Sequence, residues 1–305
     1  MVIKYGAAPK RFQSKWDTTQ AGSANDTVVL PLWGGGSFNF RIDWGDGKAN
    51  RDDITAYNQP EVTHQYDDTG IYTIKIVGDI SGWYFNNAGD DDKITEISSW
   101  GPLTLNIYNS FYGCSNLVVT ADQGPTMIGD QDNAFRDCPH VTNIGELDLS
   151  QVTDMNYMFH GCTGFNQDVS NWNMSNVTNI NSIFRFNTVF DQDVGNWDMS
   201  NITDIYTWLY PGPLPFNNGG SPSISGWDTS SLTNVGYAFH RCTGFNQPLD
   251  GWNMASVTTM QNMFYEASNF NNGGSTGINN WRPSSCTNMN SVFYKASSFF
   301  QPSKG

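Results

Sequence analysis

The chain has 305 residues, of which 38% are hydrophobic and 14% aromatic, so it has enough apolar side chains to build a core. Only 14% of the residues are charged and the formal net charge is −14. This balance argues against binding to nucleic acids or anionic membranes, because both require basic patches. The sequence has no run of 18 apolar residues, so it predicts no membrane-spanning helix.

Short strands separated by turns are expected in the first hundred residues. Residues 28–30 are apolar, Phe38, Phe40 and Ile42 alternate with polar neighbours, and residues 71–76 alternate again. A period of two is typical of a half-buried strand. The spacing of these strands and turns predicts a small antiparallel β-sandwich within residues 1–101.

Two groups of aspartates in this region are candidate cation sites. Asp43 and Asp46 belong to a tight glycine-containing turn, whereas Asp90, Asp91 and Asp92 are adjacent. Carboxylates suit calcium, but aspartates also cap backbone amides in turns. We expect Asp43 and Asp46 to cap their turn and residues 90–92 to form a solvated turn, so we predict no metal site.

The rest of the chain, residues 102–305, repeats one phrase. Residues 165–178, FNQDVSNWNMSNVT, return as residues 190–203, FDQDVGNWDMSNIT, at an offset of 25 without a gap. The anchor position of the repeat is held by Phe111, Phe135, Phe159, Phe184, Leu209, Phe239, Phe264 and Phe293, at spacings of 24, 24, 25, 25, 30, 25 and 29. A fixed period in the twenties predicts a solenoid of about eight units, each burying its apolar face against its neighbours.

Each unit is expected to contain a helical turn and an extended stretch. Val152, Met155 and Phe159 recur at the spacing of one face of a short helix. Apolar residues within 169–174 have polar residues between them, and we expect such stretches to pair into a parallel sheet with strands about 4.8 Å apart. The polar side chains between them would then form ladders on the outer face of this sheet.

These outward ladders are the predicted binding surface, with Asp168 above Asp193, Asn171 above Asn196, and Asn173 above Asp198. Two F-N-N-G-G-S insertions cause the long spacings and are expected to project from one face. The predicted partner-binding residues are therefore Asp168, Asn171, Asn173, Asp193, Asn196, Asp198, Asn217, Asn218, Asn271 and Asn272. The alternative is that these residues only keep the solenoid soluble and regular.

Cysteines and histidines are not arranged for chemistry. Each of Cys114, Cys138, Cys162 and Cys242 lies three residues after an anchor, where other units carry small side chains, and Cys286 replaces a core valine. We therefore expect buried, unpaired thiols. His160 and His240 follow their anchors and are expected to be solvated. No nucleophile elbow, phosphate loop or dinucleotide fingerprint occurs, so we predict neither enzymatic activity nor a cofactor.

Two stretches resemble known families. The IDWGDG turn of residues 42–47, with HQY at 64–66 and GIY at 70–72, resembles the polycystic-kidney-disease (PKD) type of immunoglobulin-like domain. That resemblance implies a spacer or stalk. The Met-Phe, F-N-Q, N-W and S-N-V-T steps resemble the BspA-type leucine-rich repeat of bacterial surface proteins, from residue 12 to about residue 301. This second resemblance implies surface display, adhesion, and protein or glycan binding without catalysis.

Two roles follow from these observations. Residues 1–11 lack the apolar core of a signal peptide, which favours a phage virion component, either a capsid decoration or a tail protein, with other virion proteins as partners. The BspA-type resemblance favours a bacterial cell-surface adhesin that binds host protein or glycan. We expect the virion role, with the adhesin as the alternative. Both roles are compatible with a homo-oligomer, and neither involves nucleic acid.

Overall fold

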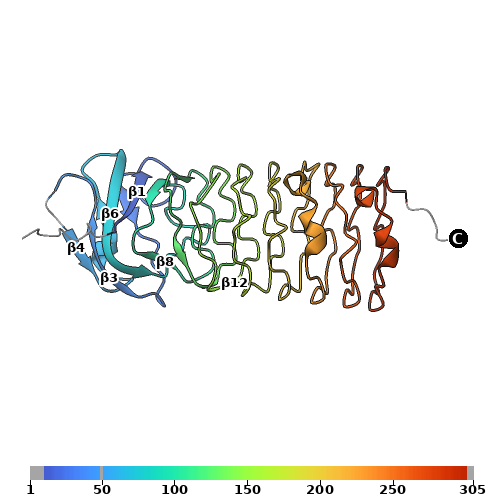
Figure 1. Ribbon diagram of the computed structural model, residues 1–305. Helices are drawn as coiled ribbons and strands as arrows, with labels where there is room; N and C mark the ends of the chain where they lie inside the picture. The colour runs from blue at the N-terminus through green and yellow to red at the C-terminus, as the bar shows by residue number, and fades with distance from the viewer. Residues whose placement is uncertain (1–9, 49–50, 301–305) are drawn as a thin grey trace, which may run out of the picture.

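The computed structural model describes residues 10–48 and 51–300. Figure 1 shows a β-rich N-terminal part, followed by coils that lie side by side along one axis toward the C-terminus. The described residues contain strands and 3-10 helices but no α-helix. The mainly β character predicted from the sequence is confirmed.

The strands are β1 (Phe12–Asp17), β2 (Thr27–Val29), β3 (Phe38–Asp43), β4 (Arg51–Ile54), β5 (Thr63–Gln65), β6 (Ile71–Ser81), β7 (Ile94–Ser99), β8 (Leu103–Leu105), β9 (Val118–Val119), β10 (Thr126–Met127), β11 (Gly129–Asp130) and β12 (Val152–Asp154). The 3-10 helices are η1 (Pro60–Val62), η2 (Asn218–Gly220), η3 (Pro222–Gly226), η4 (Asn272–Gly274) and η5 (Gly277–Asn280).

An eight-stranded sheet forms the centre of the N-terminal part. Its long strand β6 pairs antiparallel with β1 through residues 71–76 and with β3 through residues 75–80. Strand β7 pairs with β1, and β4 with β3, whereas β2 and β5 form a separate pair. Gly78 in β6 has φ +117°, and a Cβ there would lie 2.4 Å from the Asn39 carbonyl oxygen, so only glycine fits. The strands expected near residues 28–30, 38–42 and 71–76 are confirmed.

The same sheet continues beyond residue 101. Strand β8 pairs parallel with the end of β6, β10 with β8, and β9 with β7. Trp100 packs edge-to-face on Phe111 and Phe135, with ring centroids 5.5 and 6.1 Å apart. We call the repeats after residue 101 the array, and each repeat around one anchor residue a coil. The N-terminal part therefore covers the first coil of the array, and the two share a sheet and an aromatic core.

Aromatic columns fill the interior of the array. Phe111, Phe135 and Phe159 stack with centroids 5.4 and 5.7 Å apart and planes within 3° of parallel. Trp172 stacks on Trp197 at 5.9 Å in a second column, in which the indole N–H bonds to a carbonyl of the preceding coil. Each coil thus buries its aromatic side chains against the coils beside it.

The backbone around each anchor forms turns, so the predicted helical turn is wrong. The residue two before the anchor has a positive φ, between 52° and 59°, in all eight coils: Asn109, Asn133, Tyr157, Ser182, Thr207, Tyr237, Asn262 and Ser291. The N–H groups of Tyr157 and Phe159 donate to carbonyls of the next coil, at 2.9 and 3.0 Å. A helix would use these N–H groups within one segment, and bonding between coils takes them instead.

The parallel pairing also lies elsewhere than predicted. Residues 165–174 form turns and irregular chain, not a strand, because local bonds such as Trp172 N–H to Val169 O close the chain on itself. The parallel bridges run instead through Asp154, Asn179, Asp204, Asn234, Thr259 and Asn288. Side chains reinforce this line, since Asn179 Nδ2 donates to Asp154 Oδ2 at 3.1 Å.

Candidate functional site

The predicted ladder residues lie at the surface, but most of their side chains stabilise turns. Asp168, Asn173 and Asp198 each accept a hydrogen bond from the backbone N–H two residues further on, at 2.9, 3.1 and 3.0 Å. Asn171 and Asn196 are exposed, and their side chains form no hydrogen bond within residues 10–48 and 51–300. These two asparagines are therefore the members of the ladder that are open to a partner.

The two F-N-N-G-G-S insertions fold back onto the array instead of projecting from it, and the side chains of Asn218 and Asn272 are not exposed. Both side chains are fully buried. Asn218 Oδ1 accepts from the N–H of Val194 at 2.8 Å, and its Nδ2 donates to Asp193 Oδ1 at 3.2 Å. Asn272 Oδ1 likewise accepts from the N–H of Leu249 at 2.8 Å, and its Nδ2 donates to Asp250 Oδ1 at 2.7 Å. A buried backbone N–H needs an acceptor, and these side chains supply it.

Asn217 and Asn271 are half-buried and also join neighbouring coils. Asn217 Oδ1 accepts from the N–H of Asn246, and Asn271 Oδ1 from the N–H of Phe300, both at 2.9 Å. Asp193 is half-buried, and its carboxylate accepts hydrogen bonds from Gly195, Asn218 and Ser223. The insertions share one place in the repeat, as predicted, but their polar residues stabilise the array.

The prediction for the cysteines is confirmed, and the prediction for the histidines is wrong. All five cysteines are free; Cys286 is half-buried and the others are buried. His160 and His240 are only 7% and 8% exposed, instead of solvated. Burial, together with the nearby charge of Arg241, lowers the pKa of His240 to about 4, so this ring is neutral at pH 7.

Sequence reasoning missed a column of rings and guanidinium groups directly after the anchors. It consists of Tyr112, Arg136, His160, Arg185, Tyr210, His240, Tyr265 and Tyr294, and we refer to it as the aromatic strip. The signal was present in the sequence, because aligning the repeats on their anchors places a planar side chain at this position in every coil. Because these residues differ in type and share only their planar shape, a comparison by residue type does not reveal the regularity.

Most neighbouring groups of the aromatic strip are in direct contact. The His240 and Tyr265 rings stack with centroids 4.8 Å apart and planes 3° from parallel, and Tyr294 stacks on Tyr265 at 4.8 Å. Arg136 Cζ lies 4.9 Å from the centre of the Tyr112 ring, and Arg185 Cζ lies 5.2 Å from that of Tyr210. These are cation–π distances. Contacts therefore join Tyr112 to Arg136 at one end of the strip and run from Arg185 to Tyr294 at the other, while His160 between them contacts Phe186 beside the strip.

Positive charge in the array is concentrated at the aromatic strip. Of the arginines and lysines in residues 103–300, all but Arg282 lie in the strip or one residue after it: Arg136, Arg185, Arg241 and Lys295. Glu266 pairs with Arg241 and Lys295 at 3.1 Å each, and Asp137 lies 3.4 Å from Arg136 and His160. The His160 ring beside Asp137 is the main reason that the pKa of this carboxyl group is lowered. Arg185 has no ion pair within the described part of the chain.

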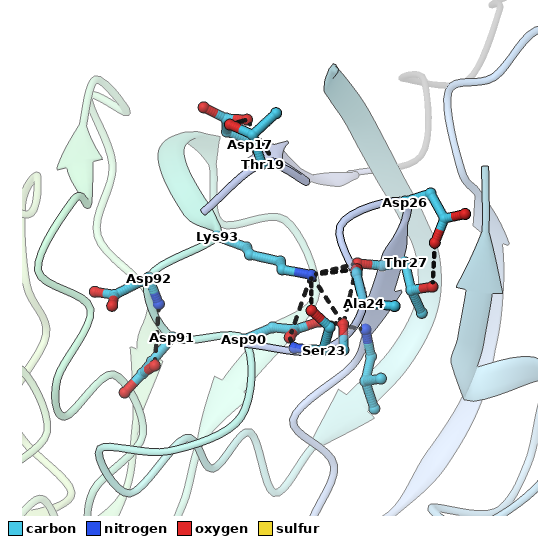
Figure 2. A network of polar contacts seen from close by, with 11 residues as sticks. Asp17, Thr19, Ser23, Ala24, Asp26, Thr27, Asp90, Asp91, Asp92 and Lys93 are labelled. Atoms are coloured by element: carbon cyan, nitrogen blue, oxygen red, sulfur yellow. Dashed lines mark hydrogen bonds and ion pairs between the residues drawn. The ribbon is translucent and has the colours of Figure 1, made fainter. Parts of the chain in front are cut away.

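Lys93 occupies the interior beside the aspartate run, and Asp90 is buried with it, so the prediction of a solvated turn is wrong for Asp90. Figure 2 shows the Lys93 side chain pointing toward the loop that contains Ser23 and Thr27. Its Nζ donates to the carbonyl oxygens of Ser23, Ala24 and Thr27 at 3.0, 2.9 and 2.8 Å. Asp90 lies 3.7 Å away and accepts from the N–H of Ser23 at 2.6 Å. The ammonium group thus takes the place that a metal cation would need.

The turn at Asp43 and Asp46 is capped as predicted. Each carboxylate accepts from the backbone N–H two residues further on, at 3.1 and 2.9 Å. Asp46 Oδ2 also lies 3.0 Å from His64 Nε2, and the His64 ring stacks on Trp44 at 4.8 Å. Burial raises the pKa of Asp46, but the N–H of Lys48 and the His64 ring outweigh it, and the pKa is lowered.

A cavity of about 600 Å³ lies over β3, β4 and β6 and is lined in part by Arg11, Arg41, Asp53 and Lys75. Arg41 is paired with Asp53 at 2.9 Å. Within residues 10–48 and 51–300, no three His, Cys, Asp or Glu side chains are grouped as a metal site would require. No helix in that part of the chain is long and apolar enough to cross a membrane.

Comparison with known proteins identifies the repeat region. No curated protein and no solved structure matches the chain. A family model described as "Mycoplasma protein of unknown function, DUF285" matches twice, over residues 129–219 and 216–305. The two matches follow each other through the coils of the array and together cover more than half of the chain, so this protein belongs to the DUF285 family.

Proposed function

We propose that this protein is a non-enzymatic binding protein displayed on an outer surface, and that its array is a leucine-rich-repeat type solenoid. The observation that carries the proposal is the aromatic strip, which repeats a planar side chain on eight neighbouring coils. With about 4.8 Å between neighbouring coils, the eight strip residues span about 34 Å. Backbone bonds between coils, such as Phe159 N–H to Ile183 O, hold this length rigid, and a rigid surface loses little entropy on binding.

Membership of DUF285, a family of leucine-rich-repeat-like surface proteins, favours the cell surface over the virion. The N-terminal part is the proposed PKD-like spacer, since Trp44, His64 and Tyr66 form one cluster in which the Tyr66 hydroxyl donates to the Trp44 carbonyl. We therefore propose adhesion as the role, with a host protein or a glycan as the partner. The array supplies the binding surface, and the N-terminal part covers its first coil.

Location is the direct test of this function. Intact cells that produce the protein are treated with an added protease, and antibodies detect what remains in the envelope and in the cell interior. We expect loss of the protein from washed envelopes without lysis of the cells. Detection only in the cell interior, or only in purified phage particles, would contradict the proposal of cell-surface display.

A further inference from the structure

We propose that the aromatic strip binds a linear glycan. This inference rests on the proposed function as a surface binding protein and deepens it in two ways. It places the contact on the side of the coil that carries the anchors, not on the predicted asparagine ladder. It also selects a glycan, not a protein, as the partner.

Exposed aromatic rings on and beside the strip are the first argument. Tyr108, Phe186 and Tyr294 are 42%, 40% and 49% exposed. They belong to the first, fourth and eighth coils, so they are distributed along the whole strip. Each of these rings presents a face that a ligand can contact without any rearrangement of the array. A sugar ring has an apolar C–H face that packs on such a ring, as apolar surfaces pack on aromatic side chains generally.

Unused hydrogen-bond donors are the second argument. Six tyrosines of this face have hydroxyls that form no hydrogen bond with other described residues: Tyr112, Tyr157, Tyr206, Tyr210, Tyr237 and Tyr265. Arg185 lies among them without an ion pair, held by cation–π contact with Phe186 and Tyr210. Hydroxyl, carboxylate and ring oxygens of a glycan are the acceptors that these donors require.

The geometry of the strip is the third argument. The centroids of adjacent rings are 4.7 to 4.8 Å apart from Tyr210 to Tyr294, so planar side chains follow one another along a line. A linear polymer engages several rungs at once, so weak single contacts add through effective concentration. The arginines and lysines gathered here also make this the part of a net-acidic array that tolerates acidic sugars. Neutral and acidic glycans are therefore separate arms of the test.

The aromatic strip and the asparagine ladder lie on different sides of the core. Phe159, from the anchor segment, and Trp172, from the ladder segment, meet inside the coil with centroids 5.9 Å apart. Side chains that point outward from the two segments therefore leave the coil in different directions. Variants of one surface do not disturb the other, which makes a matched comparison possible.

The test measures binding of the full chain to an immobilised neutral glucan, mannan, hyaluronate and heparin. The strip variant combines Arg185→Gln, Phe186→Ser and Tyr294→Ser; the ladder variant combines Asn171→Ala and Asn196→Ala. We expect at least one glycan to bind, with affinity reduced about tenfold or more in the strip variant and unchanged in the ladder variant. An acidic glycan would lose affinity as salt is raised, whereas a neutral glycan would not.

Thermal unfolding of both variants is measured alongside, and equal midpoints show that a loss of affinity does not reflect unfolding. Binding that survives in the strip variant, or that is lost in the ladder variant, would overturn the inference. If the protein bound none of the four glycans but was displayed on the surface and bound a host protein, the inference would be overturned and the proposed function would stand. Absence from the surface would instead overturn the proposed function.

Discussion

Lys93 and Asp90 form a fully buried pair, and each charged group also has hydrogen-bond partners other than its counterpart. Their closest atoms are 3.7 Å apart, while Lys93 Nζ also donates to the Ser23 hydroxyl at 2.9 Å, and Asp90 accepts from that hydroxyl at 2.9 Å. The loop before β2 is thus fastened to the segment before β7 by one hydrogen-bonded cluster (Figure 2). Its polar groups replace the water that both charges lose on burial.

Replacing Lys93 by Met is expected to destabilise the N-terminal part by about 3–5 kcal/mol, because Asp90 would remain buried without its cation. Urea unfolding followed by tryptophan fluorescence measures the change. Lys295→Met is the matched control, since this lysine is exposed and pairs with Glu266 at the surface, where solvent screens the pair and its loss has little effect on stability. Equal effects of the two substitutions would show that the buried cluster is not a stabilising element.

Replacing Asn272 by Ala is expected to cost about 1–3 kcal/mol, because the buried N–H of Leu249 loses its acceptor. Asn171→Ala is the control: this side chain is exposed, and we expect a change within about 0.5 kcal/mol. Both are measured as shifts in the urea midpoint. A neutral Asn272→Ala would mean that water reaches the Leu249 N–H and that the insertion is loosely packed.

Replacing Asp132 by Asn is expected to stabilise the protein above pH 6 and not at pH 4. Burial, with the charges of Asp130 and Asp154, raises the pKa of Asp132 to about 6 from its ordinary value of 3.8. The unfolded chain therefore loses this proton first, and the native protein loses stability as pH rises from about 4 to 6. Unfolding midpoints of both proteins at pH 4 and pH 8 test this. A stabilisation of the same size at both pH values would exclude the titration as its cause.

Replacing His240 by Phe is expected to protect the protein from acid. The folded pKa of His240 is lowered to about 4, below its ordinary value of 6.5. The neutral ring therefore contributes fully to the stability of the folded protein above pH 6.5, and this contribution is lost as pH falls toward 4. Phenylalanine keeps the stack on Tyr265 and does not titrate. The difference in unfolding midpoint between pH 7.5 and pH 4.5 should be smaller in His240→Phe. An NMR titration of His240 with a midpoint near 6.5 would contradict the burial of this ring.

The sequence by itself determined the repeat and its core. Phe159, Trp172 and Cys162 recur at fixed intervals because a coil that packs only against its neighbours must bury the same position each time. The strands around Phe40 and Ile74 were equally visible, since alternation along a strand records which face is buried. Capping of the turn by Asp43 and Asp46 followed from local chemistry alone.

Only the tertiary structure decided which polar groups are free and which are used. Asn218 and Asn171 have the same side chain, yet one is buried against Val194 N–H and the other is exposed. The apolar residues around Tyr157 have the spacing of one helix face, but the backbone N–H groups of this turn donate to carbonyls of the next coil. Lys93 reads as a surface residue, and its partners come from a loop about 70 residues earlier. Contacts between distant segments decide such cases, and a local pattern does not record them.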